Sequence, residues 1–370
     1  MLNEPATRPA LGAVRADGLP VHVRYDRTLR VKIIDACGMT CTFCHNEGTP
    51  VVADNLGRAL DGLTAEGRSG RVSIYLGSNG ARFLPATVLP NDEFTSAVTR
   101  LRDALGLEEL HLTGGEPSLH PRLAQVVHAG RDAGLRVCLT SNGENGARVM
   151  ANCAQAGLDR VNFSIFGTTA AELAQVQHAR YADVHRAEKK LRALRESVRA
   201  TLKYGVRASA NIVVPSYEHA PRVRRLMDEF APELSVRLLN SLAEGAESVE
   251  AIETILSELG AVPFAHHIVA GASGWRTAYR LPNGRVVWFK RIRPLRLPRT
   301  CTGCPLNNGR DCQEGYYGVR LYRDRAGGYQ VGVCIQRMDL CQPLDEFLAS
   351  DLCQEIIALR DAEYGPLAVA

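Results

Sequence analysis

Short apolar runs alternate with amphipathic patterns between residue 28 and about residue 259. The apolar runs predict strands at residues 28–35, 109–113, 135–140, 159–165, 206–214 and 235–239. Apolar positions that recur every three or four residues predict helices at residues 91–105, 121–133, 146–156, 182–204, 218–230 and 247–259. Strands that alternate with helices are typical of parallel sheets with crossover connections. We therefore predict the α/β class with a partial (β/α)6 barrel of the TIM type, and an open doubly wound sheet is the alternative.

Residues 49–90 interrupt this alternation. They contain glycine and proline breaks, a possible short helix near residues 53–60 and a strand-like run at residues 72–76. A long connection directly after the first strand is often a lid or a substrate-contacting element, and a solvent-exposed decoration is the other interpretation. We treat residues 49–90 as an insertion in the barrel.

After residue 260, hairpin patterns replace the strand–helix alternation. Two strand-like runs, residues 276–281 and 285–292, flank Asn283-Gly284, a pair that suits a type I′ turn. Residues 319–323 and 329–335 predict a second hairpin, and residues 344–361 a closing helix. The change predicts two domains, a barrel at residues 1–259 and a small β-hairpin-rich domain at residues 260–370.

Composition and charge narrow the class of protein. Of the 370 residues, 45% are hydrophobic and 23% are charged, which excludes collagen-like and disordered chains. The net charge of +4 is too small to indicate nucleic acid, and the basic run at residues 290–299 lacks the interleaved aromatics of a nucleic-acid surface. No apolar run approaches the roughly 18 residues of a membrane span. The first twelve residues lack a signal-peptide pattern, so we expect a cytoplasmic protein without membrane or nucleic-acid partners.

Eleven cysteines are many for such a protein, and seven of them form two groups. The first group is Cys37, Cys41 and Cys44, and the second is Cys301, Cys304, Cys312 and Cys334. An odd total at short spacings argues for metal or cluster ligation in a reducing compartment rather than for disulfides. Cys138 and Cys153 lie in apolar patterns and are interpreted as ordinary buried cysteines.

The first group has the spacing C-x3-C-x2-C and follows directly on the first predicted strand. Three thiolates within eight residues can hold one compact cluster and leave one metal corner without a protein ligand. Structural zinc sites usually have four protein ligands. A zinc site with His45 as the fourth ligand, or simple core cysteines, are the alternatives.

With Phe43 before its third cysteine, this segment resembles the radical S-adenosylmethionine (SAM) superfamily. The resemblance implies that the three cysteines hold a 4Fe–4S cluster and that SAM binds the vacant iron. It further implies that one electron cleaves SAM to a 5′-deoxyadenosyl radical, which abstracts hydrogen from a small-molecule substrate. Such an enzyme needs a reducing partner such as flavodoxin or ferredoxin.

Further motifs of the superfamily follow the next strands. The resemblance implies that the segment from Gly114 through Gly115 and Glu116 to Pro117 holds the methionyl amine of SAM, because glycines allow close approach and a carboxylate accepts hydrogen bonds. A strand-to-helix turn is the alternative there. After the third strand, Ser141 and Asn142 match the ribose contacts of the superfamily, although alone they form an ordinary Asn-Gly turn.

The later strands add candidates for the interior of the barrel. Asn162 and Ser164 share one face of the fourth strand, because side chains alternate along a strand. Arg207 and Arg237 on the fifth and sixth strands are candidates to bind the SAM carboxylate or an anionic substrate, with a structural salt bridge as the alternative. The predicted SAM-binding set therefore comprises Gly114, Gly115, Glu116, Pro117, Ser141, Asn142, Ser164 and Arg237.

The second cysteine group has the spacing C-x2-C-x7-C-x21-C, which also fits a zinc knuckle. The resemblance implies instead a second, auxiliary 4Fe–4S cluster held by Cys301, Cys304, Cys312 and Cys334. With four cysteine ligands, every iron of the cluster has a protein ligand. With three, one iron has no protein ligand and is open to the substrate. Cys341 lies near enough in sequence to Cys334 to be an alternative ligand.

Within the superfamily, the chain is similar to the GTP 3′,8-cyclases of molybdenum-cofactor biosynthesis. The similarity rests on residues 29–35, on His-Asn-Glu-Gly after Cys44 and on Val236-Arg237-Leu238. The wider spacing of the second cysteine group and the single Arg320 in the run Gly-Val-Arg-Leu depart from the cyclases, which favours another nucleotide, a nucleoside, a sugar or a natural-product intermediate as substrate. A true GTP cyclase, a peptide-modifying maturase and a non-catalytic iron–sulfur or zinc scaffold are the alternatives.

Overall fold

The computed structural model describes residues 13–14, 17–229 and 234–369. The expected lack of a signal peptide rests on the first twelve residues and falls outside this part of the chain, as does the predicted end of a helix at residue 230.

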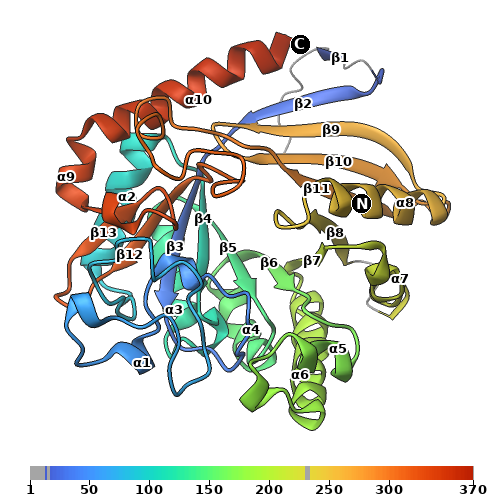
Figure 1. The fold of residues 1–370 in the computed structure, drawn as a ribbon, viewed down its shortest axis with the longest axis horizontal. Coiled ribbons are helices and arrows are strands. Elements are labelled where there is room, and N and C mark those ends of the chain that lie inside the picture. The colour runs from blue at the N-terminus through green and yellow to red at the C-terminus, as the bar shows by residue number, and fades with distance from the viewer. Residues whose placement is uncertain (1–12, 15–16, 230–233, 370) are drawn as a thin grey trace.

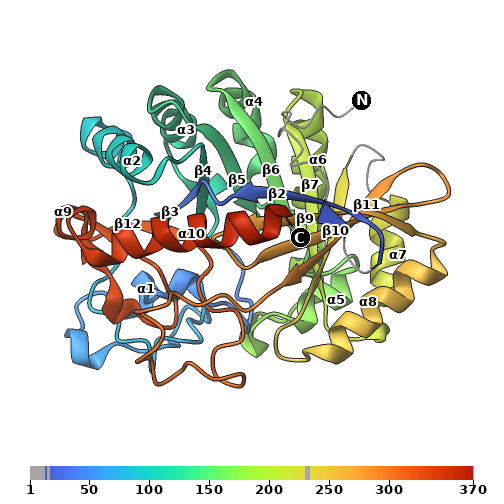
Figure 2. The same ribbon diagram turned by 90° about the horizontal axis from the view of Figure 1, so that it is seen from above.

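Six parallel strands form the centre of the sheet, as predicted. Their bounds are β3 Thr28–Ile34, β4 Glu109–Gly114, β5 Arg136–Ser141, β6 Leu158–Ser164, β7 Arg207–Val214 and β8 Ser235–Asn240. The helices that follow them are α2 Asp92–Leu105, α3 Leu123–Asp132, α4 Gly146–Gln155, α5 Ala170–Gln175, α6 Val184–Lys203, α7 Ala220–Glu229 and α8 Ala246–Glu258. The strands curve around an open interior while helices such as α2, α3 and α4 lie outside them (Figure 2), so the partial (β/α)6 barrel is confirmed.

The elements after residue 260 extend this sheet at both of its edges. Strands β9 Val262–Ala270, β10 Gly274–Arg280 and β11 Val286–Ile292 continue it beyond β8, and β12 Val319–Arg323, β13 Tyr329–Gly332 and β14 Gln342–Pro343 continue it beyond β3. Two N-terminal strands, β1 Ala13–Val14 and β2 Pro20–Tyr25, complete the sheet, which has fourteen strands within the described part of the chain. The predicted boundary at residue 260 falls between α8 and β9, and the division into two domains stays a prediction.

The chain itself joins the two halves of the sheet. β2 pairs in parallel with β9, and only Asp26 and Arg27 separate β2 from β3 in the centre of the sheet. The backbone N–H of Asp26 donates to the carbonyl of Ala270 (2.8 Å), and helix α10 (Asp351–Val369) packs on β2 and β9 (Figure 1). A short α9 (Leu344–Leu348) precedes α10. The curved sheet therefore surrounds its interior more completely than six strands alone would.

The apolar core lies on the outer side of the barrel strands, beneath the helices. On β3, Leu29, Val31 and Ile33 are fully buried, in one core cluster with Phe94 and Val98 of α2. The alternate positions of β3 and β4 are polar and face inward, and they are Thr28, Arg30, Lys32, Glu109, His111 and Thr113. Ordinary TIM barrels fill this interior with branched apolar side chains. Here the hydrophobic stabilisation lies outside, which leaves the interior for polar chemistry.

Four local predictions were wrong. The helix near residues 53–60 is only the four-residue α1 (Val52–Asn55). Residues 72–76 form no strand, because Val72 makes only an isolated β-bridge with Glu66 and residues 74–76 form turns. The first hairpin does not use a type I′ turn, because Gly284 has positive φ and Asn283 does not. The closing helix is broken into α9 and α10 between Leu348 and Asp351. Sequence reasoning also missed β2, α5 and β9.

None of the helices in the described ranges is both long and apolar enough to cross a membrane.

Candidate active site

The loop that carries the first three cysteines lies at the carboxyl end of β3. This cysteine loop (residues 37–44) is fixed by the loops after β5 and β6. The N–H of Gly38 donates to Glu144 (2.8 Å) and the N–H of Thr40 donates to Gln177 Oε1 (2.7 Å). Gln177 also donates through Nε2 to Cys41 Sγ (3.5 Å). The geometry of the loop is thus set by neighbouring strands as well as by its own sequence.

The glycine pair after β4 allows two strand ends to touch. A Cβ on Gly114 would lie 2.3 Å from the carbonyl oxygen of Ile34, and one on Gly115 would lie 2.2 Å from that of Asp35. The N–H of Gly115 donates to Ile34 O and that of Glu116 donates to Ala36 O, both at 2.8 Å. The glycines therefore bring β4 against the backbone that leads into Cys37, a physical reason that differs from the ligand approach expected from the sequence.

Glu116 connects the predicted SAM motifs to one another. Its side chain is 1% exposed, and it accepts hydrogen bonds from Ser118 N (2.9 Å), Ser141 Oγ (2.7 Å) and Asn142 N (2.6 Å). Burial raises the pKa of Glu116, against the effect of these hydrogen bonds. Asn142 in turn donates through Nδ2 to Cys37 Sγ (3.5 Å). Glu116, Ser141 and Asn142 thus form one hydrogen-bonded group beside the cysteine loop.

The three thiols fit an iron–sulfur cluster better than a single metal ion. Cys37 also accepts from Met39 N (3.4 Å), and Cys44 accepts from Asn46 N (3.3 Å), so N–H donors face all three sulfurs. Such donors stabilise the negative charge of ligating thiolates. Across the described residues, no three His, Cys, Asp or Glu side chains converge as one metal ion requires. Burial raises the pKa of the free Cys37 and Cys41 thiols to about 12, so ligation has to displace protons.

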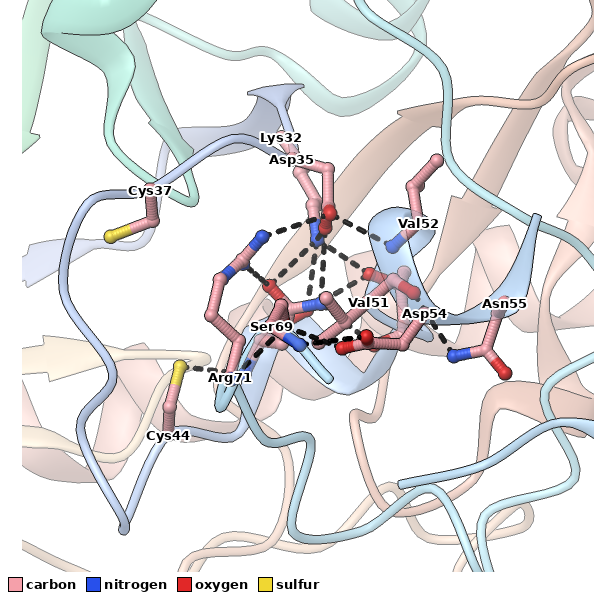
Figure 3. A network of polar contacts seen from close by, with 12 residues as sticks. Lys32, Asp35, Cys37, Cys44, Val51, Val52, Asp54, Asn55, Ser69 and Arg71 are labelled. Carbon is pink, nitrogen blue, oxygen red and sulfur yellow. Dashed lines mark hydrogen bonds and ion pairs between the residues drawn. The ribbon is translucent and has the colours of Figure 1, made fainter. Parts of the chain in front are cut away.

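A buried polar network lies beside the cysteine loop (Figure 3). Asp35 Oδ1 accepts from Lys32 Nζ (2.8 Å), and Asp35 Oδ2 accepts from Arg71 Nη1 (3.0 Å) and Val52 N (2.9 Å). Lys32 is only 2% exposed and also donates to Thr49 Oγ1 (2.6 Å). Burial raises the pKa of Asp35, but attraction to Lys32 and Arg71 outweighs it and holds that pKa well below its usual range. The network anchors residues 49–90 to the end of β3, directly before the cysteine loop.

Three consecutive left-handed residues follow the cysteine loop. Asn46, Glu47 and Gly48 have φ values of 47°, 56° and 77°, which is costly for the first two. Asn46 is held by Arg71 Nη2 (2.9 Å), and Glu47 by an ion pair with Arg320 (3.1 Å). As a result, His45 and Glu47 line the interior of the barrel while Asn46 is buried in the network around Asp35.

The interior of the barrel is a polar cavity of about 390 Å³. Its lining includes three acidic residues, Asp26, Glu47 and Glu109. The basic residues that line it number seven, and they are Arg24, Arg30, Arg160, Arg237, Arg276, Lys290 and Arg320. Two of the acids are already paired, Glu109 with Arg160 and Glu47 with Arg320. This barrel cavity therefore carries surplus positive charge and is suited to an anionic ligand.

The cavity floor contains residues that the sequence analysis missed. His111 Nε2 lies 2.8 Å from Thr140 Oγ1 and 3.2 Å from Asn162 Nδ2, and Arg237 Nη1 donates to Asn162 Oδ1 (3.0 Å). Burial lowers the pKa of His111 to about 3, so its ring is neutral at pH 7. The sequence does contain a signal for a polar interior, because polar residues occupy every second position of two predicted strands, at residues 28, 30 and 32 and at residues 109, 111 and 113.

The second cysteine group lines one small, enclosed cavity of about 30 Å³. Its lining includes Cys301, Cys304, Cys312 and Cys334 together with Tyr316, and Cys341 is not part of it. Arg337 donates through Nη1 to Cys304 Sγ (3.3 Å). Glu355 of α10 fixes the segment before Cys301 by accepting from Thr300 N (3.1 Å) and Thr300 Oγ1 (2.6 Å). We call this space the second cysteine cavity.

The remaining predicted residues are not part of the hydrogen-bonded group around Glu116. Pro117 begins a 3₁₀ turn after β4, and Ser164 is the last residue of β6, opposite Asn211 of β7. Arg237 lines the barrel cavity, whereas Arg207 begins β7, at the end of the strand remote from the cysteine loop. Cys138 and Cys153 are buried in the protein core.

Comparison with known proteins agrees with this geometry. The family model described as the radical SAM superfamily matches residues 31–230. A probable GTP 3′,8-cyclase of Metallosphaera sedula is 26% identical over 309 residues, which cover 81% of this chain and 83% of the relative. One from Sulfurisphaera tokodaii is 26% identical over 306 residues, 80% of this chain and 81% of the relative. The crystal structure of Streptococcus suis SuiB bound to S-adenosylmethionine is similar in fold, with a TM-score of 0.50 and 11% identity over 93% of this chain and 68% of SuiB.

Removing the charge of Asp35 should unfold the base of the cysteine loop. Asp35→Asn leaves Lys32 and Arg71 buried without a carboxylate, so we expect the free energy of unfolding to fall by about 3–5 kcal/mol. Urea denaturation of the apoprotein measures this, and the variant should also retain less iron after anaerobic reconstitution. Asp345→Asn breaks only an exposed pair with Arg100 and should change stability by less than about 1 kcal/mol. Wild-type stability and iron content in Asp35→Asn would contradict the supporting role of the network.

Proposed function

Because the chain belongs to the radical SAM superfamily, we propose that its cysteine loop and the residues around Glu116 form the SAM-cleaving centre of an enzyme that acts on a small anionic substrate in the barrel cavity. The family implies a 4Fe–4S cluster and SAM. The observation that carries the proposal is the placement of three thiols and the group around Glu116 at the carboxyl ends of β3, β4 and β5, where the active sites of barrels lie.

In this proposal Cys37, Cys41 and Cys44 ligate the cluster, and N–H donors from Met39, Asn46, Gln177 and Asn142 stabilise their thiolates. The bound cluster and SAM supply a 5′-deoxyadenosyl radical that abstracts hydrogen from the substrate. Glu116 keeps one acceptor position beyond its three internal hydrogen bonds, which is available to the methionyl amine. The predicted Gly114, Gly115, Pro117, Ser141 and Ser164 complete the proposed SAM site.

The charge of the barrel cavity supports an anionic substrate. Seven basic residues face three acidic ones there, and the guanidinium groups can bind phosphate oxygens in a bidentate manner. The relatives from Metallosphaera sedula and Sulfurisphaera tokodaii are named probable GTP 3′,8-cyclases. We therefore propose a phosphorylated small molecule, with nucleotides as the first class to test. His111 and Asn162, on the cavity floor, would contact its uncharged part.

The second cysteine cavity is proposed to hold an auxiliary 4Fe–4S cluster. Four thiols line one enclosed space, and across the described residues no three of them converge as a single zinc ion would require. Four cysteines would close the cluster, which suits electron transfer or structure rather than substrate ligation. We also propose a one-electron donor such as flavodoxin or ferredoxin, and a reducing cytoplasmic compartment in which the eleven thiols stay free of disulfides.

The SAM-cleaving centre is tested by iron content and by 5′-deoxyadenosine. After anaerobic reconstitution we expect about eight irons per chain, and about four in the Cys37/Cys41/Cys44→Ala variant. With SAM and dithionite, only the wild type should form 5′-deoxyadenosine. Cys153→Ala removes a core cysteine away from both groups and should behave as the wild type. Nucleoside formation by the triple variant would refute the assignment of the cysteine loop.

The substrate class is tested by nucleotide binding. GTP should bind the reconstituted enzyme more tightly than guanosine, because the phosphates meet the basic lining, and its affinity should fall with salt. Arg237→Gln keeps a donor for Asn162 but removes the charge, and should raise the dissociation constant about tenfold. Equilibrium dialysis under anaerobic conditions measures both, with the surface variant Arg195→Gln as control. Equal affinity for guanosine and GTP would exclude phosphate recognition.

The auxiliary cluster is tested by cysteine variants that leave the first site intact. Cys301/Cys304→Ala should lower the iron content by about four per chain and preserve SAM cleavage with dithionite. Cys341→Ala, which changes a neighbouring thiol outside the second cysteine cavity, should keep all the iron. Zinc in place of iron, or iron loss in Cys341→Ala, would overturn the proposed ligand set.

A further inference from the structure

Tyr317 occupies an unusual electrostatic position in the barrel cavity. It lies between Cys312 and Cys334 of the second cysteine group in sequence and lines the barrel cavity. Its phenol oxygen accepts a hydrogen bond from Lys290 Nζ at 2.7 Å. The side chain is partly accessible, and the surface that it exposes lies in the cavity. A ligand in the cavity can therefore reach the phenol group.

Three cations from three different strands surround this one ring. The Cζ atom of Arg30 on β3 lies 4.3 Å from the ring centre, Nζ of Lys290 on β11 lies 4.9 Å from it, and Cζ of Arg320 on β12 lies 5.8 Å from it. The acidic group that acts on Tyr317 in the opposite sense is Glu314. Glu47 is nearby but is already paired with Arg320. The positive charge around the phenol thus exceeds the negative charge.

The surrounding cations change the pKa of Tyr317 in the direction opposite to the change that burial causes in other tyrosines. Burial alone would raise the pKa of Tyr317, but Arg30 and Lys290 outweigh burial and lower that pKa below its usual value. Burial raises the pKa of Tyr279, Tyr316 and Tyr329 instead. Burial also raises the pKa of Tyr75 and of Tyr322.

Tyr316 and Tyr317 face two different cavities. Tyr316 is buried and lines the second cysteine cavity, whereas Tyr317 lines the barrel cavity. Because the two residues are adjacent in sequence, the backbone that joins them lies between the two cavities. Tyr317 therefore lies on the side of the barrel cavity, the proposed substrate site.

We propose that Tyr317 is a proton-transfer residue of the barrel cavity, that Arg30, Lys290 and Arg320 favour its phenolate form, and that this phenolate accepts a proton from an O–H or N–H group of the substrate. In this step the O–H or N–H bond of the substrate breaks and the phenol O–H bond forms. The substrate keeps the electron pair as an oxyanion or amide anion, and the cations that had stabilised the phenolate are in place to stabilise it. No oxidant or reductant takes part in the transfer. The role rests on the proposed function only in identifying the barrel cavity as the substrate site.

A spectrophotometric titration tests the ionisation without a substrate. The phenolate absorbance near 295 nm should show an early phase, below the usual range near pH 10, with the amplitude of one of the eleven tyrosines. The wild-type-minus-Tyr317→Phe difference isolates this phase from cluster absorbance. Lys290→Met should shift the phase to higher pH because it removes one cation, and Lys290→Arg should restore it. Tyr279→Phe should remove amplitude only at high pH. Superimposable wild-type and Tyr317→Phe curves would overturn the proposal.

Turnover then tests the proton transfer. With a nucleotide that the wild type converts, Tyr317→Phe should lower the rate of product formation about 10²- to 10⁴-fold and should remove the rise of kcat with pH that the phenolate causes. Tyr279→Phe, which changes a tyrosine outside the lining of the barrel cavity, should form product at the wild-type rate. Undiminished product formation in Tyr317→Phe would refute the role. If no nucleotide is converted, the proposed substrate class fails, while the titration still decides whether Tyr317 is the early-ionising group.

Discussion

The site depends on one buried carboxylate that is shared by two cations. Asp35 lies two residues before Cys37 and binds Lys32 from its own strand and Arg71 from residues 49–90. One acid between two buried bases leaves a net positive charge, which Asn46 and Thr49 moderate by directing their oxygens at Lys32. Removing water from such a group is costly, so it persists only if every member stays in place. The cysteine loop, the left-handed residues after it and the insertion are therefore held in position together.

The polar interior of the barrel is possible because the apolar core lies elsewhere. Leu29, Val31 and Ile33 of β3 pack against the outer helices, while Arg30 and Lys32 on the same strand point inward. Cations that face one another across a cavity repel, and the pairs Glu109–Arg160 and Glu47–Arg320 offset only part of that repulsion. An anion that enters the cavity would offset the remaining repulsion between the cations. The folded protein thus orients these charges before an anion binds, as expected for a preorganised site.

Local patterns in the sequence predicted the local elements well, because strands β3–β8 carry buried apolar residues at alternate positions and the helices keep a regular period. These local patterns gave wrong or missing predictions for segments whose partner strand or ion-pair partner is distant in sequence. Val319–Arg323 pairs with β3, almost three hundred residues earlier, and no local pattern specifies that β11 and β12 join opposite edges of one sheet. Residues 72–76 are apolar enough to resemble a strand, yet Arg71 is fixed by Asp35, and that long-range ion pair outweighs local propensity. The cysteine motifs were visible because their spacing is local, whereas Tyr317 and His111 acquire their environment only through tertiary contacts.

The two cysteine groups differ in a way that separates their chemistry. The first lies on a loop at the strand ends, beside the charged barrel cavity, and offers three thiols. The second lines an enclosed, mainly apolar space, offers four thiols and is separated from the barrel cavity by the segment that contains Tyr316 and Tyr317. The barrel cavity is lined mainly by charged and polar side chains, and direct access from it to the second group would require the segment that contains Tyr316 and Tyr317 to move. In the proposed function, this arrangement favours substrate chemistry at the first group and electron transfer at the second.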